Sequence, residues 1–409
     1  VDVLTPGAAA EVVLSTTPFY PEGGGQLGDH GVLRGPNGVF VVEDTRANGG
    51  AIVHSGHVSE GELRVADSVT AEVDHAWRAG AARNHTGTHL LHAALRSILG
   101  PHVRQQGSLV TPDRLRFDFT HLEQTPRAAL LEVQQLANQK VRADLEVAWR
   151  NTSYRQAVAQ GALAFFGDKY GSEVRVVEIG DDADRFSAEL CGGTHVHHTG
   201  EIGFVHILRE SSVAAGTRRI EALTGAAAES YLLEQQERLV RLADRLSTSP
   251  AEIEERVDSL QAELERLRRQ SEQLQRLQVG AVTDGLVDAA SRVGEAFVVV
   301  GRADLASVDA VKEVADRVRA RLKSAVVVLG GAIDGQPAIV AAATPDVVAL
   351  GVHSGNIVRE LSRLLGGGGG GRPDMAQAGG KDASQLDAAL TRARALVSEA
   401  LQGASGRGQ

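Results

Sequence analysis

The segment HAWRAGAARNHTGTHLLHAALRSILG, residues 75–100, marks a change from β-rich to helical sequence. Its apolar residues recur at helical spacing, and Gly100 followed by Pro101 predicts where the helix ends. His85 and His89 are four positions apart, so both imidazoles project from one face of this helix, within reach of a single metal ion. Such a pair is a weak signal by itself, because the chain contains 14 histidines.

The sequence around this helix predicts an α+β protein with several domains. Residues 1–75 alternate short β-rich runs with Gly, Pro and Asn turns, which is typical of a small β-barrel or curled sheet. Residues 76–225 mix helices with strands and predict an α/β core in which a half-buried sheet packs against helices. A length of 409 residues allows two to four domains.

The second half of the chain changes character twice. Residues 226–280 are charged and almost free of glycine, and Ser249, Pro250 and Glu252 form a capping pattern that predicts the start of a new helix. Apolar residues from Ile253 to Leu274 follow four-three spacing, which predicts a helical hairpin or a coiled coil, within one chain or across a dimer. Residues 281–409 alternate buried strands and helices and predict a C-terminal α/β domain.

The stretch ELCGGTHVHH, residues 189–198, contains the only cysteine of the chain. Cys191 and His195 form a second pair of possible ligands, in a glycine-rich loop. With the helical pair they would complete a tetrahedral zinc site of three imidazoles and one thiolate. The alternative is that Cys191 is a small buried apolar residue. His92, His197 and His198 lie close in sequence, and we expect them more often to support ligands than to bind the metal themselves.

Two glycine-rich stretches could present backbone groups to a ligand. In YPEGGGQLGD, residues 20–29, the N–H groups of Gly24 and Gly25 could face an oxyanion, and the amide of Gln26 can both donate and accept. A plain hairpin loop is the alternative. In LLGGGGGGRPDMAQAGGKD, residues 364–382, the glycines predict either a flexible linker or a backbone surface that lies along RNA, beside Arg372 and Lys381.

Composition limits the classes of function. One cysteine excludes a disulfide framework and fits a reducing compartment, and no apolar run approaches the roughly 18 residues of a membrane span. We therefore expect a cytoplasmic protein. The net charge of -10 argues against non-specific coating of nucleic acid, although a local basic patch could still bind one RNA.

Seven motifs occur in an order that resembles the C-terminal half of bacterial alanyl-tRNA synthetases, over essentially all 409 residues. They are FYPEGGGQLGDHG, RNHTGTHLLHAALR, LRFDF, FGDKYGSEVRVV, ELCGGTHVHHTGEIG, AAGTRRIEALTG and GGGGGGRPDMAQAGGKD. The resemblance implies an editing domain built of a β-barrel and a zinc-binding core, a helical hairpin, and a C-terminal domain that contacts tRNA and supports homodimers. The chain starts at Val1 without an aminoacylation half, so we expect a truncated synthetase with no ATP-dependent ligase activity of its own.

The resemblance also implies site residues and a reaction. One Zn2+ per chain would be held by His85, His89, Cys191 and His195. The reaction would be hydrolysis of the ester that joins serine or glycine to alanine-specific tRNA. Alanine is smaller than serine and enters any pocket that serine enters, so the site must recognise the serine hydroxyl. We expect Gln26 or Thr88 to make that contact, with the Gly24 and Gly25 amides on the carbonyl. The candidate tRNA contacts are Arg218, Arg219, Gly368, Gly369, Arg372 and Lys381.

Two other functions are compatible with parts of this pattern. The chain could be a non-catalytic module that dimerises and binds the tRNA elbow, with a purely structural zinc. The last domain also resembles that of DHH-type phosphoesterases. Those enzymes need an upstream DHH motif, which neither DHG at Asp29 nor VDHAW at Asp74 supplies.

Overall fold

The computed structural model describes residues 2–164, 171–181 and 185–405. It divides into two compact units, Val1–Pro250 and Ala251–Gln409. Residues 166–170 of the motif FGDKYGSEVRVV lie outside the described residues. No helix in the described ranges combines the length and the apolar character needed to cross a membrane. The elements are mixed α and β, as the sequence predicts.

The first unit begins with an antiparallel sheet of strand order β2-β5-β4-β3-β7. These strands are β2 (Ala9–Val13), β3 (Gly31–Arg34), β4 (Gly38–Asn48), β5 (Ala51–Gly61) and β7 (Thr70–Val73), and β1 (Val3–Leu4) pairs separately with β6 (Leu63–Arg64). Phe19, Leu33, Phe40 and Val42 form the centre of its core. The predicted closed barrel is not found: among the described residues the short strands β2 and β7 stay at opposite edges and do not pair.

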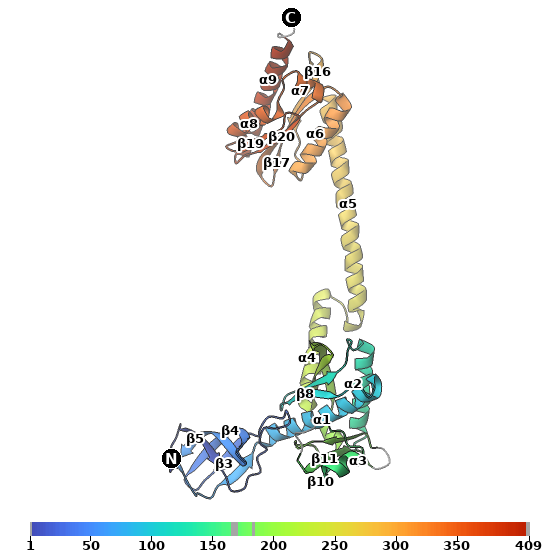
Figure 1. Cartoon of the computed structure of the whole chain (residues 1–409). Helices are drawn as coiled ribbons and strands as arrows, with labels where there is room; N and C mark the ends of the chain where they lie inside the picture. Colours follow the sequence, from blue (N-terminus) through green and yellow to red (C-terminus); the bar gives the residue numbers. More distant parts are fainter. Residues whose placement is uncertain (1, 165–170, 182–184, 406–409) are drawn as a thin grey trace. The chain divides into compact units, whose positions relative to one another are not determined.

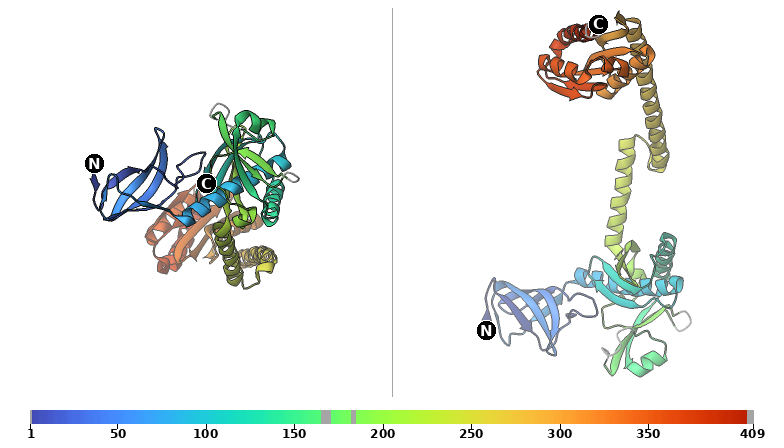
Figure 2. Two further views of the ribbon diagram at one scale, coloured as in Figure 1. Left: turned by 90° about the horizontal axis from the view of Figure 1, so that it is seen from below. Right: turned by 45° about the horizontal axis from the view of Figure 1, so that its top comes forward.

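Helix α1 (His75–Leu99) connects this sheet to the core of the first unit. The Asp74 side chain accepts hydrogen bonds from the Ala76 and Trp77 N–H groups and so begins the helix. At the other end, the Gly100 N–H donates to the Arg96 carbonyl. The predicted helix is therefore confirmed. In Figures 1 and 2 the blue strands of the N-terminal sheet are grouped at one end of α1, and the cyan and green elements of the core lie along its remainder.

The core around α1 contains two sheets and a second long helix. One sheet has the order β13-β14-β9-β8 and the other β10-β11-β12. The strands are β8 (Gln105–Val110), β9 (Leu115–Thr120), β10 (Val147–Ser153), β11 (Glu173–Ile179), β12 (Ser187–Leu190), β13 (Val205–Ala214) and β14 (Thr217–Thr224), and the helices are α2 (Arg127–Arg142) and α3 (Tyr154–Ala159). Leu90, Leu91, Phe117 and Ile220 are fully buried between them. This packing makes α1 a rigid support for the side chains on its inner face.

Two helices follow the core along the chain. The first, α4 (Gly225–Leu246), ends with Ser247 in a left-handed conformation, and a short 3-10 turn at Pro250–Glu252 precedes α5 (Ile253–Asp288). The break therefore falls where the capping pattern predicts it. The α5 helix continues beyond residue 280, where we expected the next domain to begin. Its heptad residues Leu260, Leu264 and Leu267 are exposed, and the hairpin or coiled-coil pairing stays a prediction.

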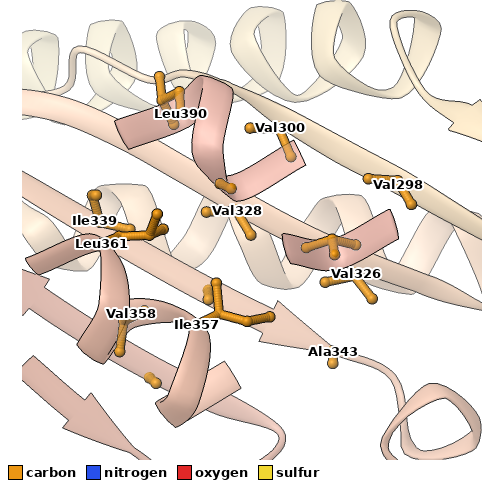
Figure 3. Packing of buried hydrophobic residues seen from close by; sticks show 14 of the residues in the cluster. Val298, Val300, Val326, Val328, Ile339, Ala343, Ile357, Val358, Leu361 and Leu390 are labelled. Atoms are coloured by element: carbon orange, nitrogen blue, oxygen red, sulfur yellow. The ribbon is translucent and has the colours of Figure 1, made fainter. Parts of the chain in front are cut away.

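The second unit is built on a six-stranded mixed sheet of order β15-β16-β17-β18-β20-β19. The strands are β15 (Ser291–Val293), β16 (Ala296–Arg302), β17 (Ala325–Ile333), β18 (Gln336–Ala343), β19 (Gly368–Gly371) and β20 (Met375–Gly379), and the helices that follow α5 are α6 (Val308–Leu322), α7 (Pro345–Ala349), α8 (Ser354–Leu364) and α9 (Leu386–Ser405). Alternate residues of each strand serve opposite faces. Val326 and Val328 pack with Ile357 of α8 and Leu390 of α9 (Figure 3), whereas Val327 packs with the residues of α6.

The six-glycine stretch is not a flexible linker. Gly368–Gly371 form β19, an edge strand paired with β20. Glycine is required by close approach of the backbones: a Cβ added at Gly367 would lie 2.0 Å from the Gly379 oxygen, and one at Gly369 would lie 2.3 Å from the Ala378 Cβ. The glycine run therefore presents a sheet edge whose outer side is backbone alone.

Candidate metal centre

The structure brings His85, His89, Cys191 and His195 together. Their ligand atoms all lie within 4.8 Å of one another. The Cys191 Sγ is 3.2 Å from His85 Nε2 and 3.4 Å from His195 Nε2. In the described part of the chain His89 Nε2 is buried without a hydrogen-bond partner. A buried imidazole nitrogen with no partner, beside a thiol and two further imidazole nitrogens, fits a soft or borderline metal cation.

Two backbone features bring these side chains into one place. His85 and His89 are one turn apart on the buried face of α1. Cys191 and His195 lie in the loop that follows β12, and this loop passes directly over His85: a Cβ added at Gly193 would be 2.0 Å from His85 Cε1 and 3.0 Å from Gln26 Oε1. Glycine at position 193 is therefore what allows the loop to approach the helix.

Each of the three imidazoles has an outer hydrogen-bond partner on Nδ1. His85 Nδ1 is 2.7 Å from Gln26 Oε1, His89 Nδ1 is 2.8 Å from Glu189 Oε2, and His195 Nδ1 is 3.2 Å from Thr86 Oγ1. The Thr86 hydroxyl donates to the Ala82 carbonyl, so it accepts from His195. Partners of this kind fix the tautomer and the ring orientation, which leaves each Nε2 as the nitrogen that can bind a metal.

Glu189 is a site residue that the sequence reasoning missed. It is 3% exposed, and its second oxygen accepts hydrogen bonds from His92 Nδ1, at 2.9 Å, and from the Ser187 hydroxyl. Burial alone would raise the pKa of Glu189, but His89 and His92 lower it well below its ordinary value. His92 therefore supports the carboxylate that orients His89. The position of Glu189 two residues before Cys191 on a strand could have indicated it.

The electrostatics of the site favour the ligand forms of Cys191 and His195. Burial alone would raise the pKa of the Cys191 thiol, but His85 and His195 lower it well below its ordinary value. Burial lowers the pKa of His195 to about 3, so its imidazole is neutral. Thiolate and neutral imidazole are the forms that bind metal. His197 and His198, the alternatives to His195, are exposed and lie outside this group of ligand atoms.

The glycine-rich loop at residues 20–29 lies against the same centre through Gln26, which is fully buried. Its Oε1 accepts hydrogen bonds from His85 and from the Thr194 N–H, and its Nε2 donates to the Thr194 hydroxyl. Gly24 and Gly25, with φ of 60° and 87°, form a tight turn closed by mutual backbone hydrogen bonds between Gly23 and Gln26. The loop is anchored at its far end by an ion pair between Asp29 and Arg78.

Thr88 lies on α1 between the two histidines and is 5% exposed. Its hydroxyl donates to the Asn84 carbonyl at 2.8 Å. A threonine oxygen that donates once still has lone pairs with which to accept a hydrogen bond. Both predicted polar contacts are thus buried, Gln26 against His85 and Thr88 within α1, and their role stays a prediction.

The predicted RNA-binding residues differ in whether their side chains are paired with carboxylates of the protein or exposed to solvent. On β14, Arg218 pairs with Glu210, and Arg219 Nε donates to Asp118 Oδ1 at 2.6 Å. Arg372 is mostly exposed, with its Nε 3.3 Å from Asp374, and Lys381 is exposed. Gly368 and Gly369 belong to the edge strand β19. The role of all six residues in RNA binding stays a prediction.

The Arg218–Glu210 pair predicts an acid-sensitive contribution to stability. The Glu210 side chain is 2% exposed; burial alone would raise its pKa, but the hydrogen bonds from Arg218 and Thr125 lower it. A lowered folded pKa gives stability that is complete above the unfolded pKa of about 4.3 and is lost as pH falls through the folded value. Replacing Glu210 with Gln should therefore cost about 3 kcal/mol at pH 7 and flatten the acid side of the stability curve. Urea unfolding from pH 3 to 7 measures both effects; unchanged stability at pH 7 would contradict the prediction.

Three segments of the chain match models of known protein families. Residues 174–221 match the family described as threonyl and alanyl tRNA synthetase second additional domain. Residues 1–77 match tRNA synthetases class II (A), and residues 295–399 match the DHHA1 domain. Two of these three descriptions name aminoacyl-tRNA synthetases, so segments at both ends of the first unit are similar to parts of that class of enzyme.

Within that class, the relatives are alanine–tRNA ligases. The chain is 47% identical to the enzyme of Chloroflexus aurantiacus, over 94% of this chain and 44% of that protein. It is 44% identical to the enzyme of Acetivibrio thermocellus, over 98% of this chain and 46% of that protein. The resemblance to the C-terminal half of this family is confirmed, and the chain spans about half the length of the curated relatives it matches. The C-Ala domain from Aquifex aeolicus alanyl-tRNA synthetase matches 27% of this chain at 27% identity, with a TM-score of 0.25.

Proposed function

We propose that this chain hydrolyses the ester of tRNA that carries serine or glycine in place of alanine, at a zinc site formed by His85, His89, Cys191 and His195. The observation that carries the proposal is the buried group of three imidazoles and one thiol, oriented by outer hydrogen bonds. Its position in a chain with a tRNA synthetase second additional domain supports an editing role. Zinc is the metal that this donor set fits best.

A bound zinc ion would supply a positive charge that fixes the α-amino group of the substrate or orients a water molecule. The chain's own residues provide the rest. Gln26, Glu189 and Thr86 hold the three imidazoles, so that the geometry of the site is set before substrate arrives. In the described structure the N–H groups of Gly24 and Gly25 donate to no other group, so they are available to donate to the ester carbonyl as negative charge develops on it.

Discrimination against alanine would come from a polar contact that alanine leaves unmade. The Thr88 oxygen donates to Asn84 and can still accept from a serine hydroxyl, and Gln26 Nε2 has one N–H beyond the one it gives to Thr194. With alanine bound, the Thr88 oxygen and the Gln26 N–H would have no hydrogen-bond partner. The free-energy cost of an unpaired polar group is larger in a buried site than in water. This arrangement favours serine over alanine without a difference in size.

Replacing Thr88 with Val tests the hydroxyl contact, because the two side chains have nearly the same shape. We expect kcat/KM for serine release to fall by roughly tenfold. This corresponds to a loss of about 1.4 kcal/mol, which is typical of one hydrogen bond in a buried site. Glycine release should change little, since glycine has no hydroxyl. Rates measured side by side on Ser-tRNA and Gly-tRNA give the answer, and an equal loss for both substrates would rule out this role for Thr88.

For the RNA itself we propose contacts by Arg372, Lys381 and the backbone of β19 at Gly368 and Gly369. Arg372 and Lys381 are exposed and can reach phosphates, while Arg218 and Arg219 would have to give up their carboxylate partners to do so. The partner would be alanine-specific tRNA, including its mischarged forms. The exposed heptad residues of α5 make a homodimer part of this proposal.

Ester loss from Ser-tRNA and Ala-tRNA, followed with and without a chelator, tests the proposed function. We expect rapid release of serine, retention of alanine, and loss of the activity on chelation, with recovery when zinc is restored. Binding of the tRNA without hydrolysis would support the non-catalytic module with a structural zinc. Full activity in metal-free protein would contradict any part for the metal.

A further inference from the structure

A cluster of two aromatic rings and one guanidinium adjoins the metal centre and is used by none of the roles above. It consists of Trp149 on β10, Arg175 on β11 and His197 in the loop that carries the metal ligands. The Arg175 Cζ lies 5.0 Å from the centroid of the Trp149 ring, and the His197 ring lies 5.4 Å from it, tilted by 37°. Trp149 is 43% exposed, and His197 is exposed as well.

Hydrogen bonds fasten this cluster to the metal-binding loop. Arg175 Nη1 donates to the carbonyls of Gly192 and Gly193, at 3.2 and 2.9 Å, and the Arg175 carbonyl accepts from the Cys191 N–H. The His197 carbonyl accepts from Val147 at the start of β10. The exposed ring of Trp149 is thus positioned by the same loop that positions Cys191 and His195. The fold therefore fixes the position of Trp149 relative to the metal-binding loop.

An exposed tryptophan face with a guanidinium and an imidazole at its side has the chemistry that binds a nucleobase. Unpaired bases stack on aromatic rings and on arginine planes, and each such contact is worth about 1–3 kcal/mol. The guanidinium would also supply positive charge next to a phosphodiester chain. An apolar peptide would not pair with the guanidinium of Arg175, so a nucleic acid suits this cluster better.

We propose that Trp149, Arg175 and His197 form a stacking platform for the 3′-terminal nucleotides of the tRNA. The identity of the ligand rests on the proposed function: the ester to be cut is carried on the terminal ribose, so the bases of that end must lie next to the metal centre. The platform would hold the end of the RNA while the aminoacyl group enters the site between α1 and the glycine-rich loop. Trp149 is then a binding residue and takes no part in bond cleavage.

Binding of the trinucleotide CCA to the full chain tests the platform directly. We expect about tenfold weaker binding for Trp149→Leu, and nearly unchanged binding for Trp149→Phe, which keeps an aromatic face. Leu122→Ala is the matched control, because Leu122 is 88% exposed in the same unit and lies outside the cluster. Equal affinity of the wild-type protein and Trp149→Leu would overturn the proposal.

A second measurement separates the platform from a structural effect and from the proposed function. With Ser-tRNA as substrate, Trp149→Leu should raise KM about tenfold and leave kcat and the bound metal unchanged. With a tRNA that lacks its terminal base, the substitution should have little further effect, because residue and base act through one contact. If the wild-type protein binds CCA through Trp149 but releases no serine, the platform stands and the proposed hydrolysis fails. If it releases serine and Trp149→Leu behaves as wild type, the platform fails alone.

Discussion

Replacement of Cys191 with Ala should remove the bound metal and reduce the release of serine from Ser-tRNA by at least roughly 10^3-fold. The thiol is the one anionic ligand of the four, and its Sγ lies within 3.4 Å of two imidazole nitrogens, so its loss leaves three neutral nitrogens with much weaker affinity. Metal content per chain by elemental analysis, and ester loss under single-turnover conditions, measure the two effects.

His198→Ala is the matched control for this substitution. His198 lies in the same loop but is exposed and outside the group of ligand atoms. It should retain about one metal ion per chain and most of the activity. If Cys191→Ala kept its metal while His198→Ala lost it, the assignment of the ligands would have to be revised. Circular dichroism on both variants shows whether the core is still folded.

Replacement of Gly193 with Ala should also weaken metal binding and hydrolysis strongly, although Gly193 has no side chain. A Cβ at position 193 would lie 2.0 Å from His85 Cε1, well inside contact distance, and would also press on Gln26 Oε1. Gly193→Ala must therefore displace His85 or lift the loop, and either movement separates Cys191 from the helical pair. We expect metal affinity to fall by roughly 10- to 100-fold, as for disturbed outer partners of metal ligands, and hydrolysis by at least as much.

The neighbouring glycine provides an unusually close control. A Cβ added at Gly192 meets no atom within 4 Å. Gly192→Ala should consequently behave as wild type in metal titration and in ester hydrolysis. Similar losses in both variants would mean that the loop tolerates no side chain for reasons of backbone freedom, and the close approach to His85 would then not be the cause.

Local patterns in the sequence predicted the helix at residues 75–99, and they indicated four candidate ligands whose atoms the structure places together. Spacing along one helix and along one loop is a short-range property, and it identified the pair on α1 and the pair that flanks Gly193. The outer partners depend on contacts between segments far apart in sequence: Glu189 and His89 are 100 residues apart, and Thr86 and His195 are 109 apart. The spacing of residues along one helix or strand gives no information about contacts between such distant segments.

The same distinction explains why the closed barrel predicted for residues 1–75 is wrong and why the linker alternative for the glycine run does not hold. Residues 1–75 have the composition of a barrel, but closure depends on whether β2 and β7 meet, which is a matter of strand pairing. The glycine run at residues 366–371 has the composition of a linker, yet Gly368–Gly371 form a strand because β20 offers a partner. A side chain at Gly369 would collide with Ala378 of that partner strand. Composition thus reports the local character of a segment, whereas the strands that pair with the segment determine the structure that it adopts.

The separation between the two pairs of ligands also has a consequence for biosynthesis. His85 and Cys191 are 106 residues apart, and Gln26 precedes His85 by a further 59. On the ribosome the N-terminal sheet and α1 emerge long before the loop that completes the site. Until then, the face of α1 that carries His85 and His89 is only partly covered by the rest of the protein. The tertiary contacts of the two histidines with Cys191 and His195 can form only after residue 195 has left the exit tunnel. The proposed metal could bind with all four ligands only at that stage, when the loop at residues 20–29, α1 and the loop after β12 have all been synthesised.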